Sequence, residues 1–190
     1  MKTTRTKELT KAAVLAALLA LSAYISIPLG FTPVVLTLQT LLVNLIAMML
    51  KPRTSFLAVL VYTLAGLAGV PVFSGGAGGP AKLFGPTGGY IMAFLAAAPA
   101  MSLTKGMFLK LFCRFIKNAS AAKTASYAAN AILVGMTVIY TFGTAYMMLI
   151  MGKGAGEVLM LAVIPFIPLD IVKCIAAAVI AVPVEKALGN

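Results

Sequence analysis

The sequence contains no histidine and only four acidic residues, Glu8, Glu157, Asp170 and Glu185. Without histidine, the chain cannot form a histidine-based catalytic triad, a histidine zinc site or a histidine proton relay. Its two cysteines, Cys113 and Cys174, lack the spacing of a metal-binding or redox motif and suit ordinary apolar packing. We therefore expect no enzyme, no metal site and no cofactor.

A phosphate-binding loop is also missing. Residues 75–82 read GGAGGPAK, which fits neither GxxxxGK[ST] nor GxGxxG and follows no predicted strand. The chain therefore cannot hydrolyse ATP through such a loop. Uphill transport by this chain would require energy from another protein.

Apolar residues dominate the chain, and most of its few charged residues are basic. Fifteen Lys and Arg residues give a net charge of +11, and 62% of the residues are hydrophobic. Nucleic-acid binding would need a soluble basic face, whereas these charges separate apolar runs long enough to cross a bilayer. We predict one integral membrane domain over residues 1–190, with the lipid bilayer and not nucleic acid as its surroundings. The first apolar run has no convincing cleavage site after it, so we expect it to remain in the chain.

The apolar runs predict an all-α protein with six transmembrane helices. The predicted helices cover residues 12–27, 34–50, 54–70, 88–103, 124–151 and 168–188. Before the last of them we predict a short interfacial piece at 156–164, followed by a new helix that opens at Pro168. A single kinked helix from Val158 is the alternative.

The basic residues predict the orientation of these helices. With the N-terminus inside, twelve Lys and Arg residues fall on the inner side, two (Lys82 and Lys153) on the outer side, and Lys173 within a span. The positive-inside rule then places both termini in the cytoplasm. Residues 66–90 and the turn at 28–33 therefore share the outer face.

Residues 66–90 are unusual because they hold nine glycines, three prolines and a single charge, Lys82. Glycine permits backbone conformations closed to other residues, and proline ends helices. Irregular backbone is tolerated at membrane depth only where protein or water surrounds it. We interpret the segment as an ordered loop that caps a cavity. A flexible connector is the alternative.

Apart from Glu185 and Lys186 near the end of the last predicted helix, Asp170 and Lys173 are the only charged residues inside a predicted span. At i, i+3 they lie on one helix face, and ionisable groups in membranes usually mark a site or a pathway. A carboxylate accepts hydrogen bonds and an ammonium donates them, so the pair suits a urea-like or amide-like group. The alternative is a pair that only neutralises itself, or an acid placed at the positive end of the helix dipole.

Other polar and small residues have two interpretations each. Thr37 and Gln39 line a pocket or hydrogen-bond between helices, and Tyr90 is an interfacial aromatic or a ring that stacks on a ligand. Small residues at four-residue spacing allow close helix packing, either within the protein or against a partner. These small residues are Ala12, Ala16 and Ala20, with Ala13 and Ala17 beside them.

Four motifs in order resemble one family. GLAGVPVF and GPTGGY lie within residues 66–90, TPVVLTLQT lies upstream and IPLDIVK lies downstream. Together they resemble the BioY family, the biotin-specific substrate-binding (S) components of prokaryotic energy-coupling factor (ECF) transporters. The resemblance covers roughly residues 11–186.

The resemblance implies a six-helix S-component with a biotin pocket open to the outside, lined by helices four to six and covered by the first and third loops. It implies that Asp170 and Lys173 hold the ureido head and that the glycine-rich loop closes over the ligand. The loop N–H groups or Lys82 would hold the valerate carboxylate. The implied ligand-binding residues also include Gln39, Phe73, Ser74, Gly75, Gly76, Gly85, Pro86, Thr87, Gly88 and Tyr90.

The resemblance also implies partners and a location. These are a membrane coupling subunit and two ATPase subunits in a prokaryotic plasma membrane, with Ala12, Ala13, Ala16, Ala17 and Ala20 as the docking pattern. Two alternatives remain. One is an S-component for another vitamin, such as thiamine or riboflavin, and the other is a stand-alone channel or carrier.

Overall fold

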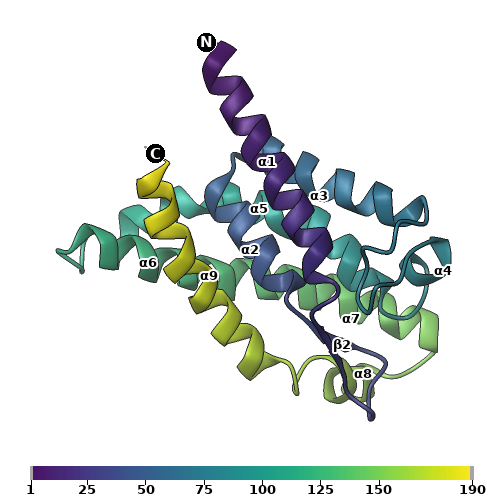
Figure 1. Ribbon diagram of the computed structural model, residues 1–190. Helices are drawn as coiled ribbons and strands as arrows, with labels where there is room; N and C mark the ends of the chain where they lie inside the picture. Colours follow the sequence, from purple (N-terminus) through teal and green to yellow (C-terminus); the bar gives the residue numbers. More distant parts are fainter. Residues whose placement is uncertain (1, 189–190) are drawn as a thin grey trace.

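The computed structural model describes residues 2–188 as a bundle of helices with one small hairpin (Figure 1). The elements in chain order are α1 (Lys2–Ser22), β1 (Ser26–Pro28), β2 (Val35–Thr37), α2 (Gln39–Met49), α3 (Pro52–Leu67), α4 (Pro80–Leu83), α5 (Gly88–Phe112), α6 (Ala119–Asn130), η1 (Ala131–Met136), α7 (Thr137–Met151), α8 (Ala155–Ala162) and α9 (Ile167–Ala187). The main core combines buried side chains of α1, α2, α3, α5, α6 and α9. The termini and the α5–α6 connection lie toward one end, while the hairpin, α4 and α8 lie toward the other.

Three helices in the described part of the chain are long and apolar enough to cross a membrane. They are α5, the continuous helical run Ala119–Met151 and α9. Helices α2 and α3 are apolar but have only 11 and 16 residues. The structure therefore supports a membrane protein.

The start of the second predicted helix is wrong. Residues 34–50 were expected to form one helix, but Val35–Thr37 pair with Ser26–Pro28 as an antiparallel hairpin, and α2 begins only at Gln39. Pro33 cannot donate a backbone hydrogen bond, and Val34 and Val35 are β-branched, so this stretch favours extended backbone. The chain is thus mostly, and not entirely, α-helical.

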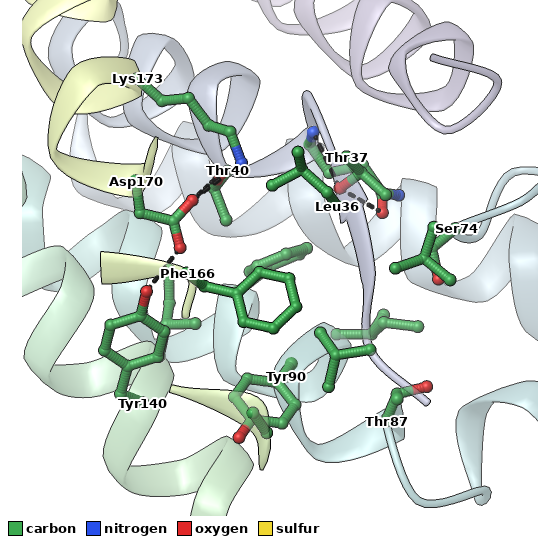
Figure 2. Close-up of a pocket in the computed structure, with 17 residues that line it drawn as sticks. Leu36, Thr37, Thr40, Ser74, Thr87, Tyr90, Tyr140, Phe166, Asp170 and Lys173 are labelled. Atoms are coloured by element: carbon green, nitrogen blue, oxygen red, sulfur yellow. Dashed lines mark hydrogen bonds and ion pairs between the residues drawn. The ribbon is translucent and has the colours of Figure 1, made fainter. Parts of the chain in front are cut away.

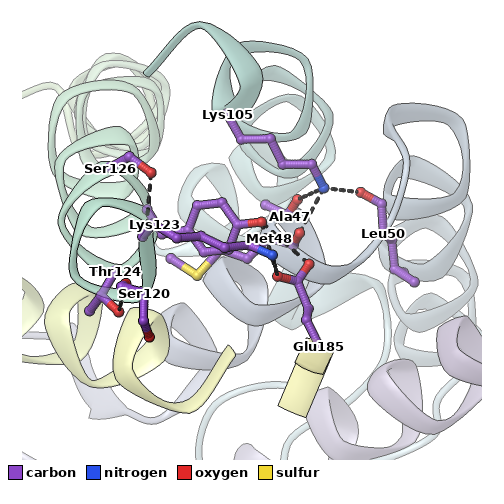
Figure 3. A network of polar contacts seen from close by, with 10 residues as sticks. Ala47, Met48, Leu50, Lys105, Ser120, Lys123, Thr124, Ser126 and Glu185 are labelled. Carbon is purple, nitrogen blue, oxygen red and sulfur yellow. Dashed lines mark hydrogen bonds and ion pairs between the residues drawn. The ribbon is translucent and has the colours of Figure 1, made fainter. Parts of the chain in front are cut away.

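Helix α5 is longer than predicted. It was expected to end at Leu103, before a basic loop, but it continues to Phe112 and includes Lys105 and Lys110. The Lys105 ammonium donates to the carbonyls of Ala47, Met48 and Leu50 at 3.1, 2.7 and 2.7 Å (Figure 3). The last carbonyls of α2 have no partner within their own helix. Lys105 therefore caps α2 from a neighbouring helix.

This cap carries a prediction about stability. Replacing Lys105 with Met keeps the aliphatic stem but leaves these carbonyls without their charged donor, so we expect a loss of about 1.5 kcal/mol. The measurement is the thermal unfolding midpoint of the purified chain in detergent. Lys186→Met, at an exposed position in the last turn of α9, serves as the control. Equal midpoints for the two variants would contradict a capping role for Lys105.

A second polar cluster joins α6 and α9 beside Lys105 (Figure 3). The buried Glu185 carboxylate pairs with Lys123 at 2.8 Å and accepts from the Tyr127 hydroxyl at 3.1 Å. The Lys123 ammonium also lies 5.7 Å from the Tyr127 ring centroid. A buried charge is tolerated when it is paired and hydrogen-bonded, which explains an acid within the bundle. The same region also corrects a helix boundary. The helix predicted at 124–151 begins earlier, at Ala119, and the Asn118 side chain caps its start.

The end of the chain agrees with its prediction. The short helix Ala155–Ala162 is separate from α9, which begins at Ile167, one residue before the expected Pro168. Pro168 occupies the first turn of α9, where its missing N–H leaves no hydrogen bond unmade. The single kinked helix from Val158 is therefore excluded.

The glycine-rich loop is ordered by its backbone. Gly69, Gly75, Gly76 and Gly79 have φ values of +98°, +80°, +68° and +86°, a region that residues with a Cβ rarely adopt. The Gly75 N–H donates to the Ala23 carbonyl at 3.2 Å, and the Gly79 N–H donates to the Gly66 carbonyl at 2.7 Å. These bonds connect the loop to the ends of α1 and α3. The structure thus favours the ordered loop over the flexible connector.

The small residues of α1 divide into two faces. Ala12, Ala16 and Ala20 pack against the core together with the buried Leu15 and Leu19. Ala13 and Ala17 are exposed on the opposite face. Internal packing thus accounts for the first three alanines. Only Ala13 and Ala17 remain available to a partner.

Candidate functional site

A cavity of about 70 Å³ lies between the hairpin, the glycine-rich loop and the ends of α2, α5, α7, α8 and α9 (Figure 2). Its lining residues are Val34, Val35, Leu36, Thr37, Gln39, Thr40, Ser74, Thr87, Tyr90, Ile91, Phe94, Ile139, Tyr140, Ala162, Phe166, Asp170 and Lys173. Most of these are apolar or aromatic, and one acid and one base are among them. Such a mixture is typical of small-molecule sites.

Asp170 and Lys173 occupy the first two turns of α9 and form an ion pair at 2.8 Å. The Asp170 carboxylate also accepts from the Thr40 hydroxyl of α2 at 3.2 Å and from the Tyr140 hydroxyl of α7 at 2.6 Å. Asp170 is buried and Lys173 is half-buried. Three donors from three helices thus hold the carboxylate at the wall of the cavity, as Figure 2 shows.

A π-helical turn precedes the Tyr140 segment. Ala131–Met136 interrupts the otherwise α-helical run Ala119–Met151. Such turns have wider i→i+5 bonding and are frequent at functional sites. Because the extra residue rotates later side chains around the helix axis, the turn helps to set the direction in which Tyr140 points.

Tyr90 forms part of the opposite wall. Its ring lies directly against Gly143 of α7, where a Cβ would overlap the ring. Its hydroxyl lies 3.2 Å from that of Thr144, and either group can donate. The glycine thus creates the space that the tyrosine ring occupies, and the threonine fixes its polar end.

Gln39 connects the cavity to the glycine-rich loop. Its side-chain amide donates to the Tyr62 hydroxyl and, at 3.3 Å, to the Val72 carbonyl. The adjacent Phe73 is fully buried and meets the Tyr62 ring edge-to-face, with centroids 5.7 Å apart. Both interpretations of Gln39 therefore apply, because it lines the cavity and bonds across helices.

The structure brings together six of the twelve predicted ligand-binding residues. Asp170, Lys173, Tyr90, Ser74, Thr87 and Gln39 line the cavity. The other six lie outside its lining, namely Phe73, Gly75, Gly76, Gly85, Pro86 and Gly88. Phe73 anchors the loop to α3, and the Gly88 N–H closes a turn onto the Gly85 carbonyl at 2.9 Å. These residues shape the loop without facing the cavity.

Lys82 is half-buried in α4 and is not among the lining residues. Burial lowers the pKa of its ammonium from the ordinary lysine value. Among the lining residues, Lys173 is the only cation. The geometry therefore gives Lys82 no direct contact with a ligand in the cavity as it stands.

Sequence reasoning missed Thr40, Tyr140 and Phe166. Thr40 follows directly after the polar Thr37 and Gln39, so its place in a polar stretch was a usable signal. Tyr140 was one aromatic in a long apolar run, and nothing in its spacing linked it to Asp170. Phe166 lies between Pro165 and Pro168, in the connection whose path the sequence does not determine.

The arrangement can bind a flat polar group at one wall and an apolar body elsewhere. Asp170 can accept from an N–H donor, and the Lys173 ammonium has two N–H groups besides the one given to Asp170. Tyr90, Phe94 and Phe166 supply aromatic surface around them. This chemistry matches a compact neutral heterocycle better than a simple ion.

Comparison with known proteins gives the same family along the whole chain. Residues 1–190 match the BioY family. The chain is 37% identical to the "Probable biotin transporter BioY" of Pyrococcus horikoshii, over 98% of this chain and 99% of that protein. It is 35% identical to "Biotin transporter BioY2" of Lactococcus lactis subsp. cremoris, over 100% of this chain and 96% of that protein.

A solved structure has the same fold. It is the S-component for biotin from an ECF-type ABC transporter, and it matches with a TM-score of 0.84 and 26% identity over 98% of this chain and 94% of that chain. The motifs of residues 66–90, the cavity beneath them and the full-length match lead to one conclusion. The chain belongs to the BioY family.

Proposed function

We propose that this chain captures biotin from outside the cell and takes part in its uptake as the S-component of an ECF-type ABC transporter. The observation that carries the proposal is the Asp170–Lys173 pair at the wall of a partly aromatic cavity, in a chain whose structural neighbour is an S-component for biotin. Its relatives are named as transporters. The chain is accordingly a transport protein and not an enzyme.

In this proposal the ureido group of biotin lies against α9. Asp170 accepts from a ureido N–H, while Lys173 donates to the ureido oxygen. The Tyr140 and Thr40 hydroxyls keep the carboxylate in place at 2.6 and 3.2 Å. The bicyclic ring packs against the aromatic lining, and loop N–H groups take the valerate carboxylate because Lys82 lies outside the lining.

The cavity must enlarge to accept biotin. Its volume of about 70 Å³ corresponds to about five water molecules. The covering hairpin has only three residue pairs and exposes Ile27 and Phe31. The glycine-rich loop, in contrast, is anchored by the fully buried Phe73. We therefore assign the opening movement to the hairpin.

The wall formed by Tyr90 carries a prediction. Gly143→Ala adds a methyl group that pushes the Tyr90 ring toward the cavity. Overpacking of this kind costs roughly 1 kcal/mol or more, so we expect about fivefold weaker biotin binding by isothermal titration. Gly106→Ala is the matched control, because a Cβ there meets nothing within 4 Å. Unchanged affinity in Gly143→Ala would show that Tyr90 does not shape the binding space.

The orientation belongs to the same proposal. We infer six crossings, by α1, α2, α3, α5, the Ala119–Met151 run and α9, with both termini in the cytoplasm of a prokaryotic cell. The distribution of basic residues supports this arrangement. The cavity then opens outward.

Turnover requires partners in this proposal. A membrane coupling subunit and two ATPase subunits supply the energy, because the chain has no phosphate-binding loop. The exposed Ala13 and Ala17 on α1 offer a flat face to the coupling subunit.

Equilibrium binding of radiolabelled biotin to the purified chain tests the function. We expect saturable binding that excess unlabelled biotin abolishes and that thiamine and riboflavin leave unchanged. Displacement by one of those vitamins would assign a different substrate. Repeated uptake by proteoliposomes containing this chain alone would instead indicate a self-sufficient carrier.

A further inference from the structure

The C-terminal end of α5 carries positive charge that no acid of the described chain neutralises. All four acids pair with lysines elsewhere, in the ion pairs Lys51–Glu8, Lys123–Glu185, Lys153–Glu157 and Lys173–Asp170. Lys110, Arg114 and Lys117 are exposed, and within residues 6–188 none of them forms an ion pair. Their neutralising anions must therefore come from outside this part of the chain.

Apolar side chains share the face with these cations. Met107, Lys110, Leu111 and Arg114 follow the i, i+3, i+4, i+7 spacing of one helix face. Met107 is 62% exposed and Leu111 48%, while Phe115 in the following turn is 79% exposed. With Phe108, the four residues of this face line a shallow, open depression on the surface. We call residues 107–117 the basic elbow.

The basic elbow projects beyond the end of the bundle. Lys105 already reaches the carbonyl of Leu50, the residue that follows α2, and α5 continues to Phe112, about 10 Å further along its axis. Tyr90, which lines the cavity, lies in the first turn of the same helix. The basic elbow and the cavity therefore occupy opposite ends of the protein.

Neither water nor hydrocarbon suits this mixed surface. Exposed large apolar side chains are unfavourable in water, and cations are costly in the hydrocarbon core. The headgroup layer satisfies both, because apolar side chains reach the acyl chains while long basic stems extend to the phosphates. Arg and Lys together match a phosphate anion.

We propose that the basic elbow is a binding site for an anionic phospholipid. The Lys110 and Arg114 side chains donate to the phosphate, and Met107 and Leu111 contact the upper acyl chains. The site is independent of the substrate in the cavity.

The test titrates the full-length chain in detergent with phosphatidylglycerol or phosphatidylcholine and records the thermal unfolding midpoint. A ligand that binds the folded state raises the midpoint, so we expect phosphatidylglycerol alone to do so. Each cation near an anionic lipid strengthens binding roughly fivefold. Lys110→Gln/Arg114→Gln should therefore need about thirtyfold more phosphatidylglycerol for the same shift. Arg53→Gln/Lys186→Gln removes the same charge from exposed positions elsewhere and should respond like the unmodified chain.

Several outcomes would overturn the proposal. Equal stabilisation by phosphatidylcholine would show that the site has no preference for an anionic lipid. If both double variants lost the response to phosphatidylglycerol equally, the response would depend on the net charge of the protein and not on this site. Stabilisation by inorganic phosphate at the same concentration would indicate a free-anion site. If Lys110→Gln/Arg114→Gln kept its response to phosphatidylglycerol but abolished uptake by the complete transporter, the basic elbow would instead contact a protein partner. Biotin affinity should stay unchanged in both double variants, which separates this test from that of the substrate.

Discussion

Asp170→Asn lowers the affinity for biotin roughly 30- to 150-fold, the largest effect that we expect of any substitution in the chain. The carboxylate accepts from Lys173, Thr40 and Tyr140. An asparagine keeps the size but removes the charge, and its amide turns two acceptor positions into donors. Breaking a buried, hydrogen-bonded charge pair typically costs about 2–3 kcal/mol or more, because the remaining ammonium is left uncompensated.

Calorimetric titration of the detergent-purified variant measures this effect. Glu157→Gln makes the same acid-to-amide change in an exposed ion pair with Lys153 and should bind biotin normally. Membrane insertion and the elution profile of Asp170→Asn should match those of the unmodified chain. A correctly inserted Asp170→Asn variant with normal affinity would refute the assignment of this carboxylate.

Lys173→Met weakens binding at least tenfold and has the second largest expected effect. Methionine retains an unbranched apolar side chain but cannot donate to the ureido oxygen. The Asp170 carboxylate keeps its Tyr140 and Thr40 donors, so the empty site is perturbed less than in Asp170→Asn. The measurement is again the dissociation constant for biotin.

The double variant Asp170→Asn/Lys173→Met distinguishes a shared role from two separate ones. Because the two side chains are 2.8 Å apart, their effects should not add, and the double variant should lose less affinity than the product of the two single losses. Strictly additive losses would mean that each residue contacts biotin without depending on the other.

The site could be predicted from the sequence where it depends on charged residues within apolar runs and on proline and glycine positions. Asp170 and Lys173 stood out because hydrocarbon surroundings make charge costly. The separate α8 and the start of α9 followed from Pro165 and Pro168, since proline favours a helix start. The ordered glycine-rich loop followed from nine glycines, four of which have positive φ.

The errors arose where tertiary contacts override local sequence. Lys105 looked like the start of a loop, but its stem extends along α5 to the carbonyls of a neighbouring helix. The hairpin strands have only three residues each, too short for a periodic signal. Tyr140 reaches Asp170 across 30 residues, and only packing establishes that contact. Ala12, Ala16 and Ala20 show the same limit, because their spacing fits a docking face and a packed core equally well.

A crystal structure of this chain with biotin bound tests the role of Asp170 and Lys173 most directly. We expect the ureido oxygen at hydrogen-bond distance, about 2.7–3.2 Å, from the Lys173 ammonium and a ureido N–H at similar range from the Asp170 carboxylate. We also expect the bicyclic ring of biotin to lie against Tyr90 and Phe166. A complex in which the ureido group faces the glycine-rich loop, while Asp170 and Lys173 bind only each other, would contradict this role.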